Sequence, residues 1–286
     1  MGSNKIVISG NSGSNFSVNC NSSSDSCIDI IGNNFGNVSD ITINGKTFSS
    51  NNVNHSPDIQ NFKVNKEERI AVNGLTKFSI GSENVPIEVR VTDQPVAIFS
   101  LNGTVGGSKD MGLNIRRWSD ELMVDVLSPS VCFNSNVKLT IELPKMKFER
   151  IELKNVSGDV HLDEGVSARG VEIKTKSGNV HLDEGVSVLD LVIKTTSGNV
   201  DTQATFERAQ FSTKSGELNF TVNAMKDIFV EASSVSGNVL GKLNNIRHAN
   251  VRQDTVSGFC RNCHDENEGH IANIWISTVS GNSFVY

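Results

Sequence analysis

The residues with the clearest chemical potential form the heptapeptide HLDEGVS, which occurs identically at 161–167 and at 181–187. Stacking of the two copies on neighbouring parallel strands would place equal residues about 4.8 Å apart. The three chemically active pairs are His161 with His181, Asp163 with Asp183, and Glu164 with Glu184. Carboxylates at that distance repel each other, so one of them holds its proton longer or a cation bridges the pair.

Three interpretations of this heptapeptide are open. Paired carboxylates flank the scissile bond in glycosidases, and a bridging cation would make a metal site. The third interpretation is a duplicated repeat whose polar residues are solvated at the corner of a coil. We predict the third, because the matching stretch one period later, 201–205, has the sequence DTQAT and does not continue the motif.

A second candidate lies near the C-terminus, where Cys260, Cys263 and His264 have the C-x-x-C-H spacing of a c-type haem attachment site. With His270 the same residues offer four ligands for zinc. The adjacent Cys263 and His264 cannot easily face one ion, and no convincing distal methionine follows. We therefore predict a protruding loop with no metal and no cofactor.

The cysteine count is odd, which does not suit a complete disulfide framework. The five positions are Cys20, Cys27, Cys132, Cys260 and Cys263. We predict reduced, unpaired thiols. The alternative is an oxidising compartment in which Cys20 pairs with Cys27 and Cys260 with Cys263.

Seven Ser-Gly pairs follow one another from residue 157 onward, at spacings of 20, 20, 18, 21, 21 and 23 residues. Seven such pairs cannot be seven nucleophiles, and the chain has no phosphate-binding Gly-rich loop, no G-x-S-x-G and no H-E-x-x-H. We predict no catalytic residue and assign the glycines to turns with positive φ. These structural glycines are Gly158, Gly178, Gly198, Gly216, Gly237, Gly258 and Gly281.

The period near 20 residues indicates a stacked solenoid. Each unit has an alternating run, the Ser-Gly turn and another alternating run, which is too short for a crossover helix. The sequence therefore predicts an all-β fold, a right-handed single-stranded parallel β-helix with coils of about 20 residues. The alternation places seven apolar side chains inside: Val171, Ile173, Val180, Leu182, Leu191, Ile193 and Val200. It places Lys174 and Lys194 outside.

Two further regions precede the seven repeats of 151–286. Residues 1–65 are rich in Asn and Ser but contain short β-prone runs, among them ITI and KTF around Asn44-Gly45, a hairpin signal. Residues 66–150 alternate apolar and polar side chains in short runs. We expect a strand-and-turn N-terminal region, then lead-in strands, then the solenoid.

The repeats KTKSGNVHL, KTTSGNV, STKSGEL, SSVSGNV and DTVSG resemble those of the bacterial putative-adhesin family, a domain of unknown function rich in T-x-SG-D/N-I/V sequences. The lead-in runs VTDQPVAIFSLNG, LNIRR, ELMVDV and LTIELP extend the resemblance over residues from about 66 to 286. The family is related to the head domains of auto-transporter adhesins. The resemblance implies the β-solenoid fold and a binding role, and it implies no catalytic residue.

Composition limits the partners. The chain has 286 residues and a formal charge of −6, which argues against nucleic acid as a partner. It contains no apolar stretch long enough to span a membrane. The start, MGSNKIVISG, has no secretory signal, so we expect a cytoplasmic protein, or a cell-surface one if the natural chain begins earlier.

The expected function is non-catalytic binding of protein or glycan along a rigid solenoid face. The alternative is end-to-end self-assembly, because ISTVSGNSFVY ends the chain with an apolar tail and no polar cap. A polysaccharide-cleaving β-helix enzyme is the third class.

Overall fold

The computed structural model describes residues 61–286, apart from 107–109, 129–132, 224–226, 245 and 263–269, together with the backbone of five short strands before residue 60. The chain divides into two compact units. One comprises Met1–Asn65, Asn102–Gly112 and Leu127–Val137, and the other Lys66–Leu101, Leu113–Val126 and Lys138–Tyr286. The described residues form β-strands and turns, and none of them forms a helix that is long and apolar enough to cross a membrane.

The first unit contains five short strands. They are β1 (Ile6–Ser9), β2 (Asn19–Cys20), β3 (Ile28–Ile31), β4 (Asp40–Ile43) and β5 (Lys46–Ser49). Strand β1 pairs in parallel with β3, and β2 with β4. The antiparallel pair β4–β5 has Ile43 opposite Lys46, which confirms the hairpin predicted around Asn44-Gly45.

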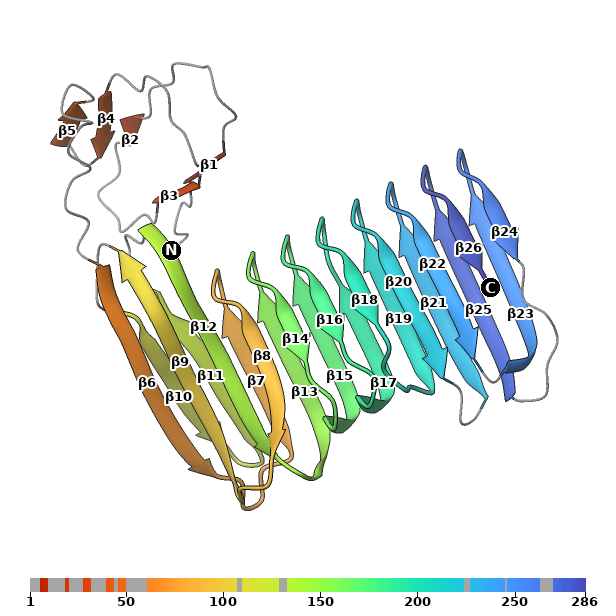
Figure 1. Cartoon of the computed structure of the whole chain (residues 1–286), viewed down its shortest axis with the longest axis horizontal. Coiled ribbons are helices and arrows are strands. Elements are labelled where there is room, and N and C mark those ends of the chain that lie inside the picture. Colours follow the sequence, from red (N-terminus) through yellow and green to blue (C-terminus); the bar gives the residue numbers. More distant parts are fainter. Residues whose placement is uncertain are drawn as a thin grey trace. The chain divides into compact units, whose positions relative to one another are not determined.

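Two large sheets carry the repeats (Figure 1). The ten-stranded sheet has the spatial order β10 (Gly112–Trp118), β11 (Glu121–Leu127), β7 (Lys77–Ser82), β13 (Lys147–Asn155), β15 (Ser167–Thr175), β17 (Ser187–Lys194), β19 (Arg208–Thr213), β21 (Ile228–Ser234), β25 (His270–Thr278) and β23 (Ile246–Thr255). The eleven-stranded sheet has the order β24 (Cys260–Asn262), β26 (Ser283–Val285), β22 (Val239–Asn244), β20 (Leu218–Asn223), β18 (Val200–Thr202), β16 (Val180–Leu182), β14 (Val160–Leu162), β8 (Ile87–Thr92), β12 (Phe133–Pro144), β9 (Val96–Gly106) and β6 (Asn61–Ala71).

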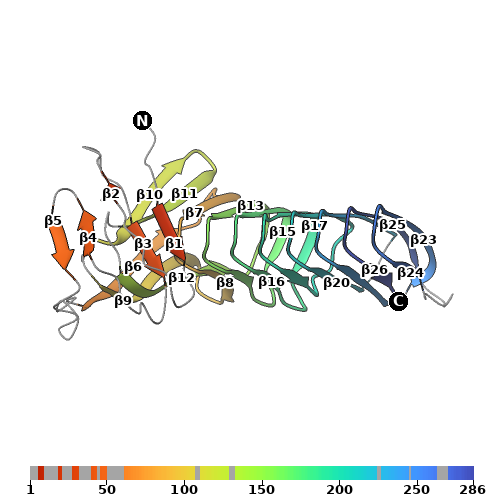
Figure 2. The ribbon, with the colours of Figure 1, turned by 90° about the horizontal axis from the view of Figure 1, so that it is seen from above.

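Successive repeats pair in parallel and in register. Ile151 is opposite Val171, which in turn is opposite Leu191, and in the other sheet Val160, Val180 and Val200 align in the same way. Each coil therefore contributes one strand to each sheet, and Figure 2 shows the two sheets as facing layers along the repeats. The predicted all-β fold with stacked parallel strands is confirmed.

The apolar side chains of the alternating runs fill the space between the sheets. All seven residues predicted to face inward are at most 1% exposed, whereas Lys194 is exposed and Lys174 is half-buried. The predicted inward register is therefore confirmed. Stacking identical positions on adjacent coils gives continuous aliphatic contacts, which supply most of the driving force for folding.

The Ser-Gly glycines occupy tight corners, but not for the predicted reason. Gly178 and Gly198 are not among the glycines with positive φ, so that prediction was wrong. Each has no space for a side chain: a Cβ atom on Gly198 would lie 2.0 Å from the carbonyl oxygen of Gly178. Positive φ occurs instead at the opposite corner, at Gly165 (+83°) and Gly185 (+93°) of the two HLDEGVS copies.

Side chains inside the coil complete these corners. The N–H of Gly178 donates to Thr175 Oγ1 (2.9 Å), and that of Gly198 to Thr195 Oγ1 (3.0 Å). Outside the corner, Asn179 Oδ1 accepts the backbone N–H of Asn199 (3.0 Å) in the next coil. These bonds satisfy backbone donors that lie beyond the strands, so the corner is rigid as well as compact.

The last two coils are stacked out of sequence order. Strands β25 and β26 lie between β21 and β22 on one side and β23 and β24 on the other, as Figure 1 shows. The expectation that ISTVSGNSFVY forms the end of the solenoid is therefore wrong. The end coil is formed by residues 246–262.

The two coils differ at an inward position. Ile276 of β25 is 2% exposed between Ala232 of β21 and Gln253 of β23. Gln253 occupies the equivalent inward position of the end coil, and its Nε2 is buried without a hydrogen-bond partner among the described residues. The observed order buries the isoleucine and leaves Gln253 half-buried.

Candidate functional site

The two HLDEGVS copies stack as predicted. His161 is directly opposite His181 in the β14–β16 pair, and the ring centroids are 5.0 Å apart. Both side chains point away from the core, because Val160, Leu162 and their counterparts point into it. The predicted side-by-side arrangement of the histidines is confirmed.

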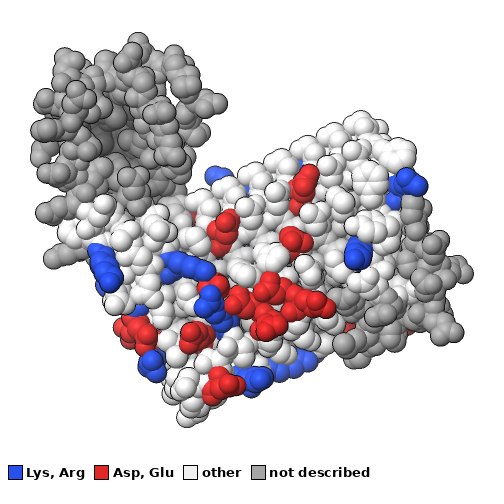
Figure 3. All heavy atoms as spheres, in the orientation of Figure 1, with Lys and Arg blue, Asp and Glu red and all other residues white. Residues whose placement is uncertain are grey.

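The same register extends the row in both directions. Glu88 of β8 is opposite His161, and Asp201 of β18 is opposite His181. Four neighbouring strands therefore present Glu88, His161, His181 and Asp201 in one line across the outer face of the eleven-stranded sheet. Figure 3 shows acidic side chains gathered on this face over β14 and β16, with basic side chains beside them.

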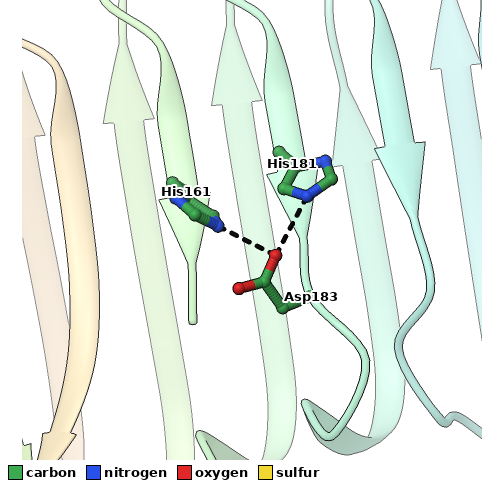
Figure 4. A group of neighbouring side chains, drawn as sticks. All are labelled: His161, His181 and Asp183. Atoms are coloured by element: carbon green, nitrogen blue, oxygen red, sulfur yellow. Dashed lines mark hydrogen bonds and ion pairs between the residues drawn. The ribbon is translucent and has the colours of Figure 1, made fainter. Parts of the chain in front are cut away.

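Asp183 joins the two rings (Figure 4). Its Oδ1 lies 3.0 Å from Nε2 of His161 and 2.9 Å from Nε2 of His181. The other nitrogen of each ring also faces carboxylates. Nδ1 of His181 lies 3.3 Å from Asp201 Oδ2, and Nδ1 of His161 lies 3.5 Å from Asp163 Oδ1.

Glu88 forms the buried end of the row. Its side chain is 7% exposed, and it is held by Arg90 Nη2 at 2.7 Å and Lys138 Nζ at 2.6 Å. Burial alone would raise the pKa of Glu88, but the hydrogen bonds from Lys138 and Arg90 outweigh burial and lower that pKa. The carboxylate is therefore charged and fixed in place.

The pKa of Asp163 is shifted in the opposite direction. Burial raises its pKa above the usual aspartate value and the negative charges of Glu88 and Asp183 add to this, although His161 and Arg90 act in the other direction. Its Oδ2 pairs with Arg90 Nε at 3.1 Å. Its Oδ1 is buried and accepts no hydrogen bond from the residues that the structure describes.

Sequence reasoning found part of this cluster. It paired the histidines, the aspartates and the glutamates and predicted all of them to be solvated at the corner, which holds for the exposed Glu164 and Glu184. It missed Glu88 and Lys138, which belong to strands that precede the repeats. The alternation in PIEVRVTD was the available signal, since it leaves the glutamate on the face opposite the valines.

The C-x-x-C-H candidate is described only in part. Cys260 begins β24 in the end coil as a free, half-buried thiol, and its Sγ accepts a hydrogen bond from Ser283 Oγ at 3.2 Å. Cys263, His264 and the side chain of His270 lie outside the described residues, as do the side chains of Cys20, Cys27 and Cys132. The metal-free loop and the reduced thiols therefore stay predictions, with zinc and disulfides as their alternatives.

A second surface, on the outer face of the ten-stranded sheet, was missed altogether. Trp275 of β25 is 52% exposed and meets Phe229 of β21 edge to face, with ring centroids 5.4 Å apart. A shallow depression of about 130 Å³ adjoins the indole. Its lining residues are Glu231, Ala232, Ser233, Arg252, Asp254, Trp275, Ile276 and Ser277. The signal was a tryptophan at an outward position of WISTVSG.

Comparison with solved structures finds similar folds at low sequence identity. A protein from Bacteroides fragilis described as a putative adhesin is 18% identical, with a TM-score of 0.51 over 78% of this chain and 97% of that one. A putative lipid binding protein from Parabacteroides distasonis is 15% identical, with a TM-score of 0.47 over 77% and 96% of the two chains. A putative adhesin from Parabacteroides merdae is 11% identical, with a TM-score of 0.42 over 75% and 96%.

No curated protein matches the chain. The sequence profile of the family described as Toastrack DUF4097 matches residues 77–285, from the start of β7 to the end of β26. That span includes the lead-in strands from β7 onward and all seven Ser-Gly repeats. The chain belongs to the Toastrack DUF4097 family.

Proposed function

We propose that this protein is a non-catalytic binding module that recognises a glycan on the outer face of its ten-stranded sheet, around Trp275. The proposal includes a right-handed solenoid with coils of about 20 residues, the hand preferred by parallel crossover connections. A solenoid of this kind is a rigid support, because each coil is fixed by the next through a full parallel strand pair.

The observation that carries the proposal is the exposed Trp275 indole. A tryptophan that is half exposed on a regular strand is unusual, since its large apolar surface gains most from burial. Phe229 packs against the indole with the two ring planes nearly perpendicular, and about half of the Trp275 surface stays exposed. A sugar ring stacks its C–H groups on such a flat apolar surface.

Polar side chains surround the indole as a saccharide would require. Gln210, Glu231, Trp275 and Arg252 lie in one row across β19, β21, β25 and β23. Gln210 Nε2 donates to Glu231 Oε2 at 3.3 Å, and Arg252 Nε donates to Asp254 Oδ2 at 3.0 Å. These contacts preorganise donors and acceptors beside the aromatic surface, which lowers the entropic cost of binding.

A glycan is favoured over a protein by the form of this surface. The depression is shallow, and beside its apolar residues the lining contains two carboxylates, two hydroxyls and a guanidinium, groups that pair with sugar hydroxyls. The protein with the same fold from Bacteroides fragilis is described as a putative adhesin, and a binding role for the present chain is in keeping with that description.

A glycan array compares the wild-type protein with Trp275→Ala. We expect binding to one class of glycan that is lost in Trp275→Ala and kept in Trp118→Ala, a control that removes another exposed tryptophan, 78% exposed on β10. Equal binding by both variants would contradict the site. Absence of glycan binding by the wild-type protein would contradict the proposed ligand class and leave protein as the alternative.

Self-assembly remains the alternative function, since β23 and β24 end their sheets and offer strand edges. The edge strand β23 carries the exposed Arg252 and Asp254 and has a register shift between Ile246 and His248, two features that oppose edge pairing. Light scattering at increasing protein concentration tests it, and a constant mass would exclude it. The polysaccharide-cleaving enzyme has less support, and a reducing-sugar assay tests it.

A further inference from the structure

We infer that His161, His181 and Asp183 form a binding site for a divalent transition-metal ion, of which zinc is the best example. Imidazole nitrogen and carboxylate oxygen are standard zinc ligands. The three ligand atoms lie within 4.8 Å of one another. The site lies on the sheet opposite to Trp275 and is independent of the proposed glycan surface.

The distances suit a metal. Ligand atoms about 2.0–2.1 Å from a tetrahedral zinc ion are separated by about 3.3 Å. The two Nε2 atoms lie 3.0 and 2.9 Å from Asp183 Oδ1, so small side-chain rotations would open the space for an ion. All three side chains are between 35% and 41% exposed, which gives the ion a route to the site and leaves room for a water or an external ligand.

A carboxylate lies near Nδ1 of each ring, on the side away from the proposed ion. Ligating histidines generally donate their other N–H to a carboxylate, which orients the ring and raises its basicity. Nδ1 of His181 faces Asp201 at 3.3 Å, and Nδ1 of His161 faces Asp163 at 3.5 Å and Glu88 at 4.0 Å. A metal on Nε2 would leave the one N–H of each neutral imidazole on Nδ1, where it faces these carboxylates.

The charges also favour a cation. Arg90 and Lys138 are committed to Glu88 and Asp163 at the β8 end of the row. Within the described part of the chain, Asp183 and Asp201 have ion pairs with histidines and none with lysine or arginine. An ion between His161 and His181 would compensate the aspartates that have no permanent cation beside them.

Only the duplication creates this arrangement. One HLDEGVS copy provides a single histidine, and the second copy adds the other histidine and the aspartate that both rings share. The following coil has Asp201 in place of a third histidine, so the ligand set ends there. Calcium and magnesium fit poorly, because they require six or more oxygen ligands.

The test is a zinc titration of the full chain after removal of metal with a chelator, followed by competition against a chromophoric chelator. Zinc binding by the C-x-x-C-H candidate would confuse the result, so all proteins in this test carry Cys260→Ser and Cys263→Ser. The protein with these two substitutions alone is the parent. We expect one zinc ion per chain. Asp183→Asn and His181→Gln should abolish binding, and Asp201→Asn should weaken it about tenfold. The control Glu184→Gln changes an adjacent exposed carboxylate and should bind as the parent does.

Cobalt substitution provides an independent readout, because a site with two histidines and an aspartate gives ligand-field bands without a thiolate charge-transfer band. Thermal unfolding without metal shows whether each variant is folded. Absence of stoichiometric zinc in the parent protein would overturn the site. Zinc binding that survives in folded Asp183→Asn and His181→Gln would overturn it equally.

Discussion

The carbonyl oxygen of Gly158 occupies the space that a Cβ atom on Gly178 would need, since the two positions are 2.0 Å apart. The same relationship joins Gly178 to Gly198 and Gly198 to Gly216. The glycines are therefore required because the corners of adjacent coils touch backbone to backbone.

Gly178→Ala should destabilise the protein by about 1–3 kcal/mol, the usual cost of forcing extra atoms into a packed site. Gly170→Ala is the matched control, because its Cβ would meet its nearest neighbour at an ordinary 3.7 Å. Urea unfolding measures both. Gly178→Asn distinguishes a requirement for positive φ from a requirement for close backbone approach. Asparagine tolerates positive φ, so a stable Gly178→Asn protein would contradict the close-approach account.

Ile193→Ala should cost about 2–4 kcal/mol, because the side chain is fully buried between coils that can relax only slightly. Lys194→Ala, one residue later on the outer face, should change the free energy of unfolding by less than about 0.5 kcal/mol. A thermal melt of both variants provides the comparison. A larger loss in the lysine variant would reverse the assigned faces of β17.

Glu88→Gln should lower stability at pH 7 by about 1–2 kcal/mol, because it removes charge-assisted hydrogen bonds to Arg90 and Lys138, whose side chains are about half exposed. The pKa of Glu88 is lowered in the folded state. Its contribution is therefore complete above the unfolded value of about 4.3 and is lost as the pH falls through the lowered pKa.

Urea unfolding of the wild type and of Glu88→Gln, at pH 7 and again near pH 3, measures this effect. The difference between the two proteins should be largest at pH 7 and should shrink at the acidic end. A difference that does not depend on pH would mean that Glu88 acts through packing.

Deletion of residues 270–286 should remove one coil and also unfold the coil at 246–262. Strands β23 and β24 pair with β25 and β26, so the coil at 246–262 loses its only strand partners among the described residues. Hydrogen exchange should show lost protection at 246–262 and unchanged protection near 151–200, because solenoid coils depend on their neighbours. Retained protection at 246–262 would show that β23 can pair with β21 instead.

The sequence predicts the repetitive part of this fold well. The alternation of apolar and polar residues determines which side chains face the core and which face outward, and the Ser-Gly period determines which positions of adjacent coils are aligned. The sequence does not show why the corners require glycine. A glycine is equally suited to a positive φ and to a close backbone contact, and only the neighbouring coil distinguishes them. The order of the last coils was hidden for a related reason, since DTVSG and STVSG are nearly equivalent corner sequences.

The candidate metal site shows the same limit at the level of side chains. Both histidines and Asp183 follow from the repeat, because equal positions stack. Glu88 precedes His161 by more than seventy residues and lies in a strand without a Ser-Gly motif, so no period connects the two. The prediction of a solvated duplicate did not foresee that Asp183 would lie between both rings.

The out-of-order stacking of the last two coils has a consequence for protein synthesis. A ribosome delivers residues 246–262 before β25 and β26 exist, so the growing chain cannot complete its solenoid by adding coils as they emerge. Strands β21 and β22 meet their final partners only after β25 and β26 have left the exit tunnel. The coil at 246–262 therefore cannot take its final place before the coil that follows it in the sequence has been made.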